Sequence, residues 1–243
     1  MNNYKSSSEL KSLAKGQLLG KYGVLIGAWT LQICITMLLQ LIVATFFSTT
    51  TLFDTVFYYF VSFLLSLIAC IFSAGLSLMY LKTACHYQVP FQDVFWGFHH
   101  SADKIILLMA PMMLLEMLCM TPSYIAQYFM QTSPYLDMKL YGMTFLLYLV
   151  GMLLYMVLRL PFSQMLFLLQ DFSGYSVPAL YKASVRIMKG QKLRLLYLEI
   201  SFIPLYLLSF FTCGIALLWV YPYISMTKAN FYLELMAMKN KEQ

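Results

Sequence analysis

Long apolar stretches with almost no charged residues constrain the fold of this chain more than any other feature. Five such runs hold at most one charged residue each, and they cover residues 22–47, 55–81, 105–131, 140–170 and 195–227. A helix that crosses a lipid bilayer needs about 20 mainly apolar residues. Each run is long enough for at least one crossing, so the sequence predicts at least five membrane-spanning helices.

The composition supports a lipid environment. Hydrophobic residues make up 61% of the chain and charged residues 11%, whereas soluble domains have about 45–50% and about 25%. So few charges could not cover a soluble domain of 243 residues. We therefore expect one integral membrane domain over residues 1–243, with an all-α fold: a polytopic membrane helical bundle.

The last run decides how many helices cross. Its 33 residues would form one helix of about 50 Å, but the hydrocarbon core is about 30 Å thick. Glycine readily adopts turn conformations, so a break near Thr212-Cys213-Gly214 would give two short spans, 195–211 and 214–231. One long tilted helix is the alternative.

The distribution of basic residues favours the break. Lysine and arginine gather in the N-tail (1–21), in the second and fourth connections and in the C-terminal tail (232–243), but the first connection has none. Short cytoplasmic loops are enriched in these residues. This pattern predicts about six transmembrane helices, near 22–47, 55–81, 105–130, 140–170, 195–211 and 214–231. Both termini would be cytoplasmic, although five spans remain an alternative.

Three connections on the predicted cytoplasmic side have helical spacing of apolar residues. They are the N-tail, where Ser6 and Glu9 have capping-box spacing, residues 91–98, and residues 177–188 before Gly190. Each is expected to be an amphipathic helix at the membrane interface. Val89-Pro90 and Val177-Pro178 are 88 residues apart, which suggests a unit of interfacial helix and helical hairpin used three times; chance is the alternative.

Several segments resemble a known family. They are SSELKSLAKGQLLGKYG (7–23), FQDVFWGFHHSADKIILL (91–108), SVPALYKASVRIMKGQK (176–192), Ser201-Phe202-Ile203, TCGIALLWVYPY (212–223) and Ala229-Asn230-Phe231-Tyr232-Leu233. The chain is similar to the bacterial membrane proteins catalogued as domain of unknown function 975. Pro204 and Tyr206 depart from its pattern, which more often has Gly and Trp there.

This resemblance implies a multi-pass protein of the bacterial plasma membrane with about six spans. It implies no catalytic or binding residues, because the family has none agreed. More remotely, the chain is similar to the membrane portions attached to some glycerophosphodiester phosphodiesterases, but it has no polar stretch long enough for their soluble domain.

Ionisable residues inside the apolar runs form one candidate site. A charge at the bilayer centre is costly and usually faces a partner or a wet cavity. The candidate intramembrane polar site comprises Glu116, Arg159, Gln164 and Glu199. Glu116 and Arg159 lie at similar predicted depth and could pair. The site would be either a pocket for an anionic head group or ion, or a structural ion pair.

A second candidate site is basic. The fourth connection could contact anionic inner-leaflet lipids through Lys182, Arg186, Lys189, Lys192 and Arg194. Adjacent Cys85-His86 and His99-His100 are a poor match to zinc-ligand spacing, and no metal site or cofactor is expected. Nucleic acid is not expected as a partner, because the basic residues lie between apolar runs.

Three functions remain open at this point. The first is a non-catalytic module that binds lipid or a membrane protein partner at the inner leaflet. The second is a small transporter or flippase-like carrier with a midplane polar site, for which broken helices are typical. The third, an intramembrane enzyme, has the least support because no catalytic motif is present. The oligomeric state is open.

Overall fold

The computed structural model describes residues 4–47, 51–132 and 138–242. All regular elements in these ranges are helices: α1 (Ser7–Leu18), α2 (Tyr22–Phe46), α3 (Leu52–Ala84), η1 (Phe91–Phe95), α4 (Trp96–His99), α5 (Ala102–Thr132), α6 (Met138–Arg159), η2 (Leu160–Phe162), α7 (Met165–Asp171), α8 (Val177–Ile187), α9 (Lys192–Ile200), α10 (Ile203–Phe211) and α11 (Leu217–Glu242). The expectation of an all-α fold is confirmed.

Five helical stretches in the described ranges are long and apolar enough to cross a membrane. They are Tyr22–Phe46, Leu52–Ala84, Ala102–Met130, Met138–Asp171 and Lys192–Phe211. α11 is not among them, because Lys228, Asn230 and Glu234 interrupt its apolar sequence. A sixth crossing therefore stays a proposal.

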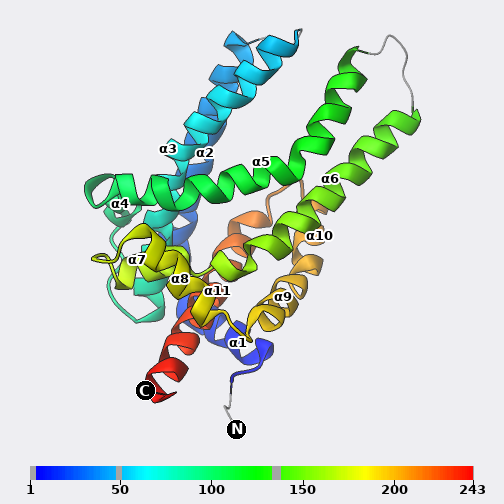
Figure 1. The fold of residues 1–243 in the computed structure, drawn as a ribbon. Helices are drawn as coiled ribbons and strands as arrows, with labels where there is room; N and C mark the ends of the chain where they lie inside the picture. The colour runs from blue at the N-terminus through cyan, green and yellow to red at the C-terminus, as the bar shows by residue number, and fades with distance from the viewer. Residues whose placement is uncertain (1–3, 48–50, 133–137, 243) are drawn as a thin grey trace.

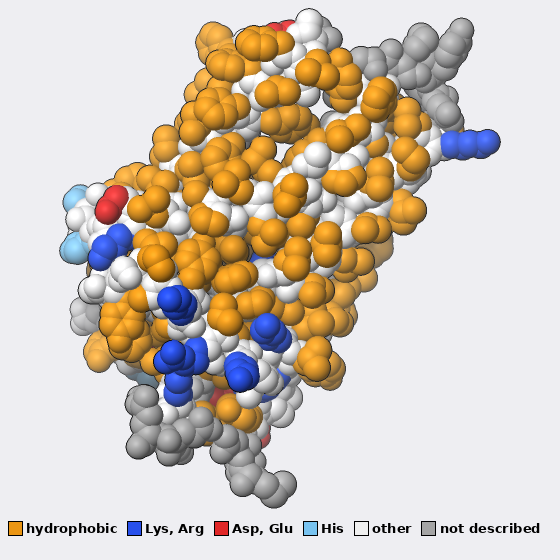
Figure 2. Space-filling view, viewed as in Figure 1, with side chains coloured by type: hydrophobic (Ala, Val, Ile, Leu, Met, Phe, Trp, Pro, Cys, Tyr) orange, Lys and Arg blue, Asp and Glu red, His pale blue; other side chains and the backbone are white. Residues whose placement is uncertain are grey.

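The surface of these helices is apolar over a wide area. Figure 2 shows hydrophobic side chains covering most of the upper part of the molecule. Phe46, Leu118 and Phe210 are 78%, 70% and 80% exposed. Soluble monomers rarely expose contiguous apolar patches larger than a few hundred Å², so this surface fits lipid better than water.

The chain forms three helical hairpins (Figure 1), α2 with α3, α5 with α6, and α9–α10 with α11. α1 and the end of α11 lie together at one end of the molecule, whereas α2 and α5 end at the opposite end. In the third hairpin the chain reverses at Cys213 (φ 50°) and Gly214 (φ 86°). The helix is thus broken where the sequence predicted.

A short helix precedes each hairpin: α1, then η1 with α4, then α8. α1 and α8 match closely at an offset of 170 residues. Both are followed by a turn with a glycine at positive φ, Gly20 at 77° and Gly190 at 80°. Equivalent positions are buried in both units: Leu10 and Leu180, Ala14 and Ser184, Leu18 and Met188, and Leu25 and Leu195. The first and third units are therefore alike in structure, which adds the N-terminal unit to the repeat that the 88-residue spacing suggested for the second and third.

α1 uses its apolar face for packing within the protein. The capping box is present, because Ser6 Oγ accepts from Glu9 N at 3.2 Å and Glu9 Oε2 accepts from Ser6 N at 2.7 Å. Leu10 and Leu18 are buried, and α1 packs against α11. The apolar stripe that was expected to face the membrane interface is therefore covered by α11.

The middle unit is also held against the protein. η1 packs on α3 so closely that a Cβ atom on Gly75 would lie 2.1 Å from Val94 O. Only a glycine allows this approach. Val94 is fully buried in this contact. Residues 91–98 were expected to form one amphipathic helix, but they form the 3₁₀ helix η1 followed by the short α4.

Proline interrupts two of the predicted spans. The run 140–170 forms α6 and α7, separated by η2 at Pro161, because proline lacks an N–H and clashes with the preceding turn. The run 195–211 forms α9 and α10, with Pro204 in the first turn of α10. α5 contains Pro111 and Pro122 and continues as one bent helix (Figure 1).

Candidate functional site

α8 presents a buried face and a basic face. Pro178 stands in its first turn, where the missing N–H has no helical partner to lose, and Gly190 turns the chain after it. Leu180 and Ser184 are buried. Ser184 Oγ donates to Pro161 O at 2.8 Å, so α8 satisfies a carbonyl at the break between α6 and α7.

The other face of α8 forms the wall of a hollow, here named the basic groove. It has a volume of about 600 Å³ and is lined by Tyr181, Lys182, Val185, Arg186, Lys189, Gly190 and Lys192. The four basic residues of this lining, Lys182, Arg186, Lys189 and Lys192, are all exposed. Figure 2 shows Lys and Arg side chains gathered on the lower part of the molecule, where α8 and α9 lie.

Four of the five predicted lipid-contact residues thus line one groove. None of them belongs to the four ion pairs found in the described part of the chain. Tyr181 closes one side, with its hydroxyl donating to Leu108 O at 2.7 Å. Burial raises the pKa of Tyr181 further above neutral pH, so this side chain adds no negative charge to the groove.

Arg194, the fifth predicted lipid contact, lies elsewhere. Its guanidinium pairs with Glu234 on α11 and donates to Lys5 O. It also stacks over the rings of Tyr4 and Phe231, 5.0 Å from each centroid. Arg194 is therefore a structural residue that joins the N-terminal segment to α9 and α11.

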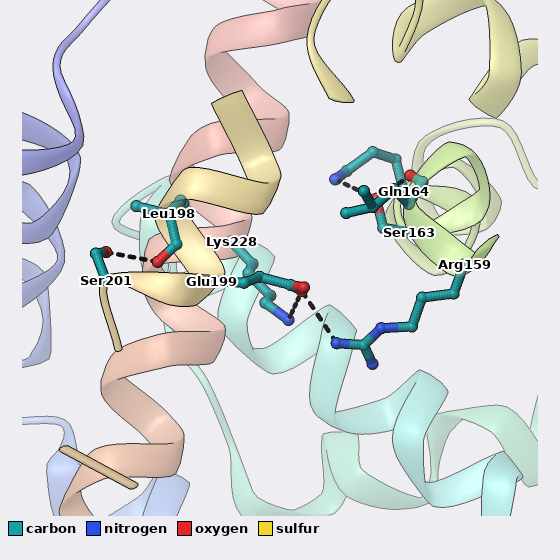
Figure 3. Close-up of polar contacts among 8 residues, drawn as sticks. Arg159, Ser163, Gln164, Leu198, Glu199, Ser201 and Lys228 are labelled. Atoms are coloured by element: carbon teal, nitrogen blue, oxygen red, sulfur yellow. Dashed lines mark hydrogen bonds and ion pairs between the residues drawn. The ribbon is translucent and has the colours of Figure 1, made fainter. Parts of the chain in front are cut away.

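A cluster of three charges joins α6, α9 and α11 (Figure 3). Arg159 Nη2 lies 3.1 Å from Glu199 Oε1, and Lys228 Nζ lies 2.6 Å from the same oxygen. Glu199 is buried, with 7% of its side chain exposed. Lys228, which lies within the predicted span 214–231, is the member that sequence reasoning missed. We name Arg159, Glu199 and Lys228 the charge cluster.

The structure separates the other two residues of the predicted polar site from this cluster. Gln164 lies apart from Glu199 in Figure 3, and its Nε2 donates to Ser163 Oγ at 3.0 Å. Glu116 interacts with the Tyr155 hydroxyl and, over a longer range, with Arg159. The ion pair of Arg159 is made with Glu199 instead, because α6 ends beside α9.

The described residues contain no group of three or more histidine, cysteine and acidic side chains that could hold a metal ion. His99 Nδ1 lies 3.1 Å from Phe95 O, and the ring of His100 stacks on Trp96. Both histidines therefore contact residues within the short connection between α3 and α5.

The comparisons with known proteins give one match. No curated protein and no solved structure matches the chain. The model of one protein family, described as "Protein of unknown function (DUF975)", matches residues 1–239, and the chain therefore belongs to this family.

Proposed function

We propose that this protein is a non-catalytic, multi-span module of the bacterial plasma membrane whose basic groove binds the head groups of anionic phospholipids in the inner leaflet. One observation carries the proposal: Lys182, Arg186, Lys189 and Lys192 line a single open hollow on α8 and α9. Basic residues at a membrane surface each contribute about 1 kcal/mol of attraction to anionic lipids.

The arrangement of the helices supports the orientation that this function needs. α1 and the end of α11 lie at one end of the molecule (Figure 1), as an even number of crossings requires. The basic groove follows α7 near the same end. We therefore propose six crossings, with α11 as the sixth, and with both termini and the groove in the cytoplasm.

The test is lipid binding by the purified protein in neutral detergent. Dioctanoyl phosphatidylglycerol is titrated by calorimetry, with dioctanoyl phosphatidylcholine as the zwitterionic comparison. The double variant Lys182→Gln/Lys189→Gln should bind the anionic lipid more weakly by about 2 kcal/mol, and the difference should shrink with added salt.

The matched control is Lys5→Gln/Lys239→Gln, which removes the same charge from the two terminal segments. It should bind the anionic lipid like the unchanged protein. Equal binding of both lipids, or equal losses in the two double variants, would count against the groove as the site.

A second function, a small carrier, is favoured by one specific observation. The charge cluster lies where α6 and the α9–α10 stretch are both broken, and carriers place polar sites at broken helices. In a protein without other cysteines, Arg159→Cys should react with a water-soluble maleimide from both sides of the membrane if the protein alternates its access. A static module should react from one side at most.

A further inference from the structure

A second, separate cleft lies between α3 and α5, on the part of the molecule away from the basic groove. Three hollows of about 620, 390 and 310 Å³ all share Tyr59 and Tyr124 in their walls. The three hollows therefore adjoin one another at these two side chains, and we name them the arms of one cleft. Volumes of about 300–1,000 Å³ are typical of small-molecule sites.

The largest arm is apolar. Leu52, Val56 and Phe60 of α3 face Leu114 and Ile125 of α5 across it. Thr55 and Thr121 are among its few polar lining residues. Its length along two helices and its apolar walls fit an extended hydrocarbon chain.

The second arm is a polar chamber. Glu116 lines it together with Gln40, Ser62 and Ser66. Ser62 Oγ is buried and has no hydrogen-bond partner within the described part of the chain. The chamber is thus the polar part of the cleft, and an ionic head group fits there better than a hydrocarbon chain does.

Three tyrosine rings in contact with one another line the place where the arms adjoin. The rings of Tyr58 and Tyr59 are 5.4 Å apart, and those of Tyr59 and Tyr124 are 4.7 Å apart. Tyrosine faces attract cations, and groups of them recognise ammonium ligands. The described lining residues of the three hollows include the carboxylate of Glu116 and no lysine or arginine.

The basic residue that acts on Glu116 already has an ion-pair partner. Arg159 is within electrostatic range of Glu116, but its ion pair is with Glu199. No ion pair in the described ranges includes Glu116. Because Glu116 is exposed to the chamber, its carboxylate can accept a ligand cation there.

We propose that this cleft binds a single-chain amphiphile with an ammonium head group. The alkyl chain occupies the apolar arm between α3 and α5. The ammonium group lies among Tyr58, Tyr59 and Tyr124 and faces Glu116. An anionic amphiphile is disfavoured, because its head group would meet the carboxylate without a basic partner in the chamber.

The experiment uses the full chain in lipid nanodiscs, which avoids competition from detergent. Radiolabelled dodecyltrimethylammonium is the probe, and unlabelled dodecyltrimethylammonium, tetramethylammonium and dodecanoic acid are the competitors. The unlabelled ammonium amphiphile should displace the probe, whereas tetramethylammonium and dodecanoic acid should displace it at least about tenfold less effectively, because each lacks one of the two contacts.

Two variants examine the two arms separately. Glu116→Gln should weaken probe binding about tenfold or more, the scale of a lost charge-assisted contact, whereas Asp103→Asn on the exposed first turn of α5 should leave it unchanged. Thr121→Trp should fill the apolar arm and abolish binding of the probe, although this variant keeps the Glu116 carboxylate.

Thermal unfolding of each variant shows that it is folded before binding is compared. Unchanged binding in Glu116→Gln and in Thr121→Trp would overturn the proposal. Equal displacement by dodecanoic acid would show a site for any alkyl chain and would overturn the assignment of an ammonium ligand. If Glu116→Gln does not fold, Tyr59→Leu takes its place and should likewise weaken binding several-fold, about the worth of a lost cation–π contact.

Discussion

Replacing Glu199 with glutamine should destabilise the protein more than any other change in the charge cluster. Its carboxylate is the shared partner of Arg159 and Lys228, at 3.1 and 2.6 Å. The variant leaves both cations without a counter-ion. Breaking a buried ion pair from one side costs about 3–5 kcal/mol, but the two cations here are partly exposed.

The exposures of the two cations set the magnitude. The Lys228 side chain is 28% exposed and that of Arg159 is 39% exposed, so water or lipid head groups can solvate Arg159 better. We expect a loss of about 3 kcal/mol for Glu199→Gln, near the lower limit for a buried pair. Arg159→Gln should cost about 1 kcal/mol or less, as for a surface pair.

The assay is reversible unfolding in mixed micelles, with Asp103→Asn as an exposed acidic control. Lys228→Met combined with Glu199→Gln should be less destabilising than the sum of the two single changes, because the double variant removes both partners. Additive effects, or a loss below about 0.5 kcal/mol for Glu199→Gln, the range of ordinary surface changes, would refute the view that these charges form one unit.

Three further predictions concern local features. Gly75→Ala should destabilise the protein strongly in thermal unfolding, because its Cβ would lie 2.1 Å from Val94 O. Gly16→Ala should instead stabilise α1 by up to about 1 kcal/mol, because no atom lies within 4 Å of its Cβ. Ser184→Ala should cost about 1–3 kcal/mol by leaving Pro161 O without its donor; a loss no larger than that of the exposed Ser12→Ala would contradict this. Burial and Asp171 raise the pKa of the Cys85 thiol. Because the thiolate is the reactive form, alkylation of Cys85 should begin at a higher pH than in a free peptide, and Asp171→Asn should shift its pH–rate profile to lower pH.

Much of the fold could be predicted from the sequence, because its determinants are local. Apolar runs longer than 20 residues, with at most one charged residue each, indicate the long helices. Gly214 marks a predicted break that the structure contains at that residue, since glycine acts on its own backbone. The Ser6–Glu9 capping box is local for the same reason. The break at Pro161 was not predicted, because residues 140–170 were expected to form one span.

The sites were harder to predict, because their partners are distant in the sequence. Depth matching suggested that Arg159 pairs with Glu116, but α9 brings Glu199 closer. Arg194 was predicted to contact lipid, but it pairs with Glu234 on α11, and Lys228 gave no sign in the sequence of its pairing with Glu199 on α9. Helical periodicity identified the apolar stripe of α1, but it could not distinguish lipid from α11 as the surface that covers it.

The proposed function depends most directly on the basic groove lying on the cytoplasmic side of a protein with six membrane crossings. In a protein without native cysteines, Lys189→Cys and Lys139→Cys place single thiols in the groove and at the start of α6. A membrane-impermeant maleimide should label Lys139→Cys in intact cells, and it should label Lys189→Cys only after the cells are opened. Labelling of Lys189→Cys in intact cells would contradict the account.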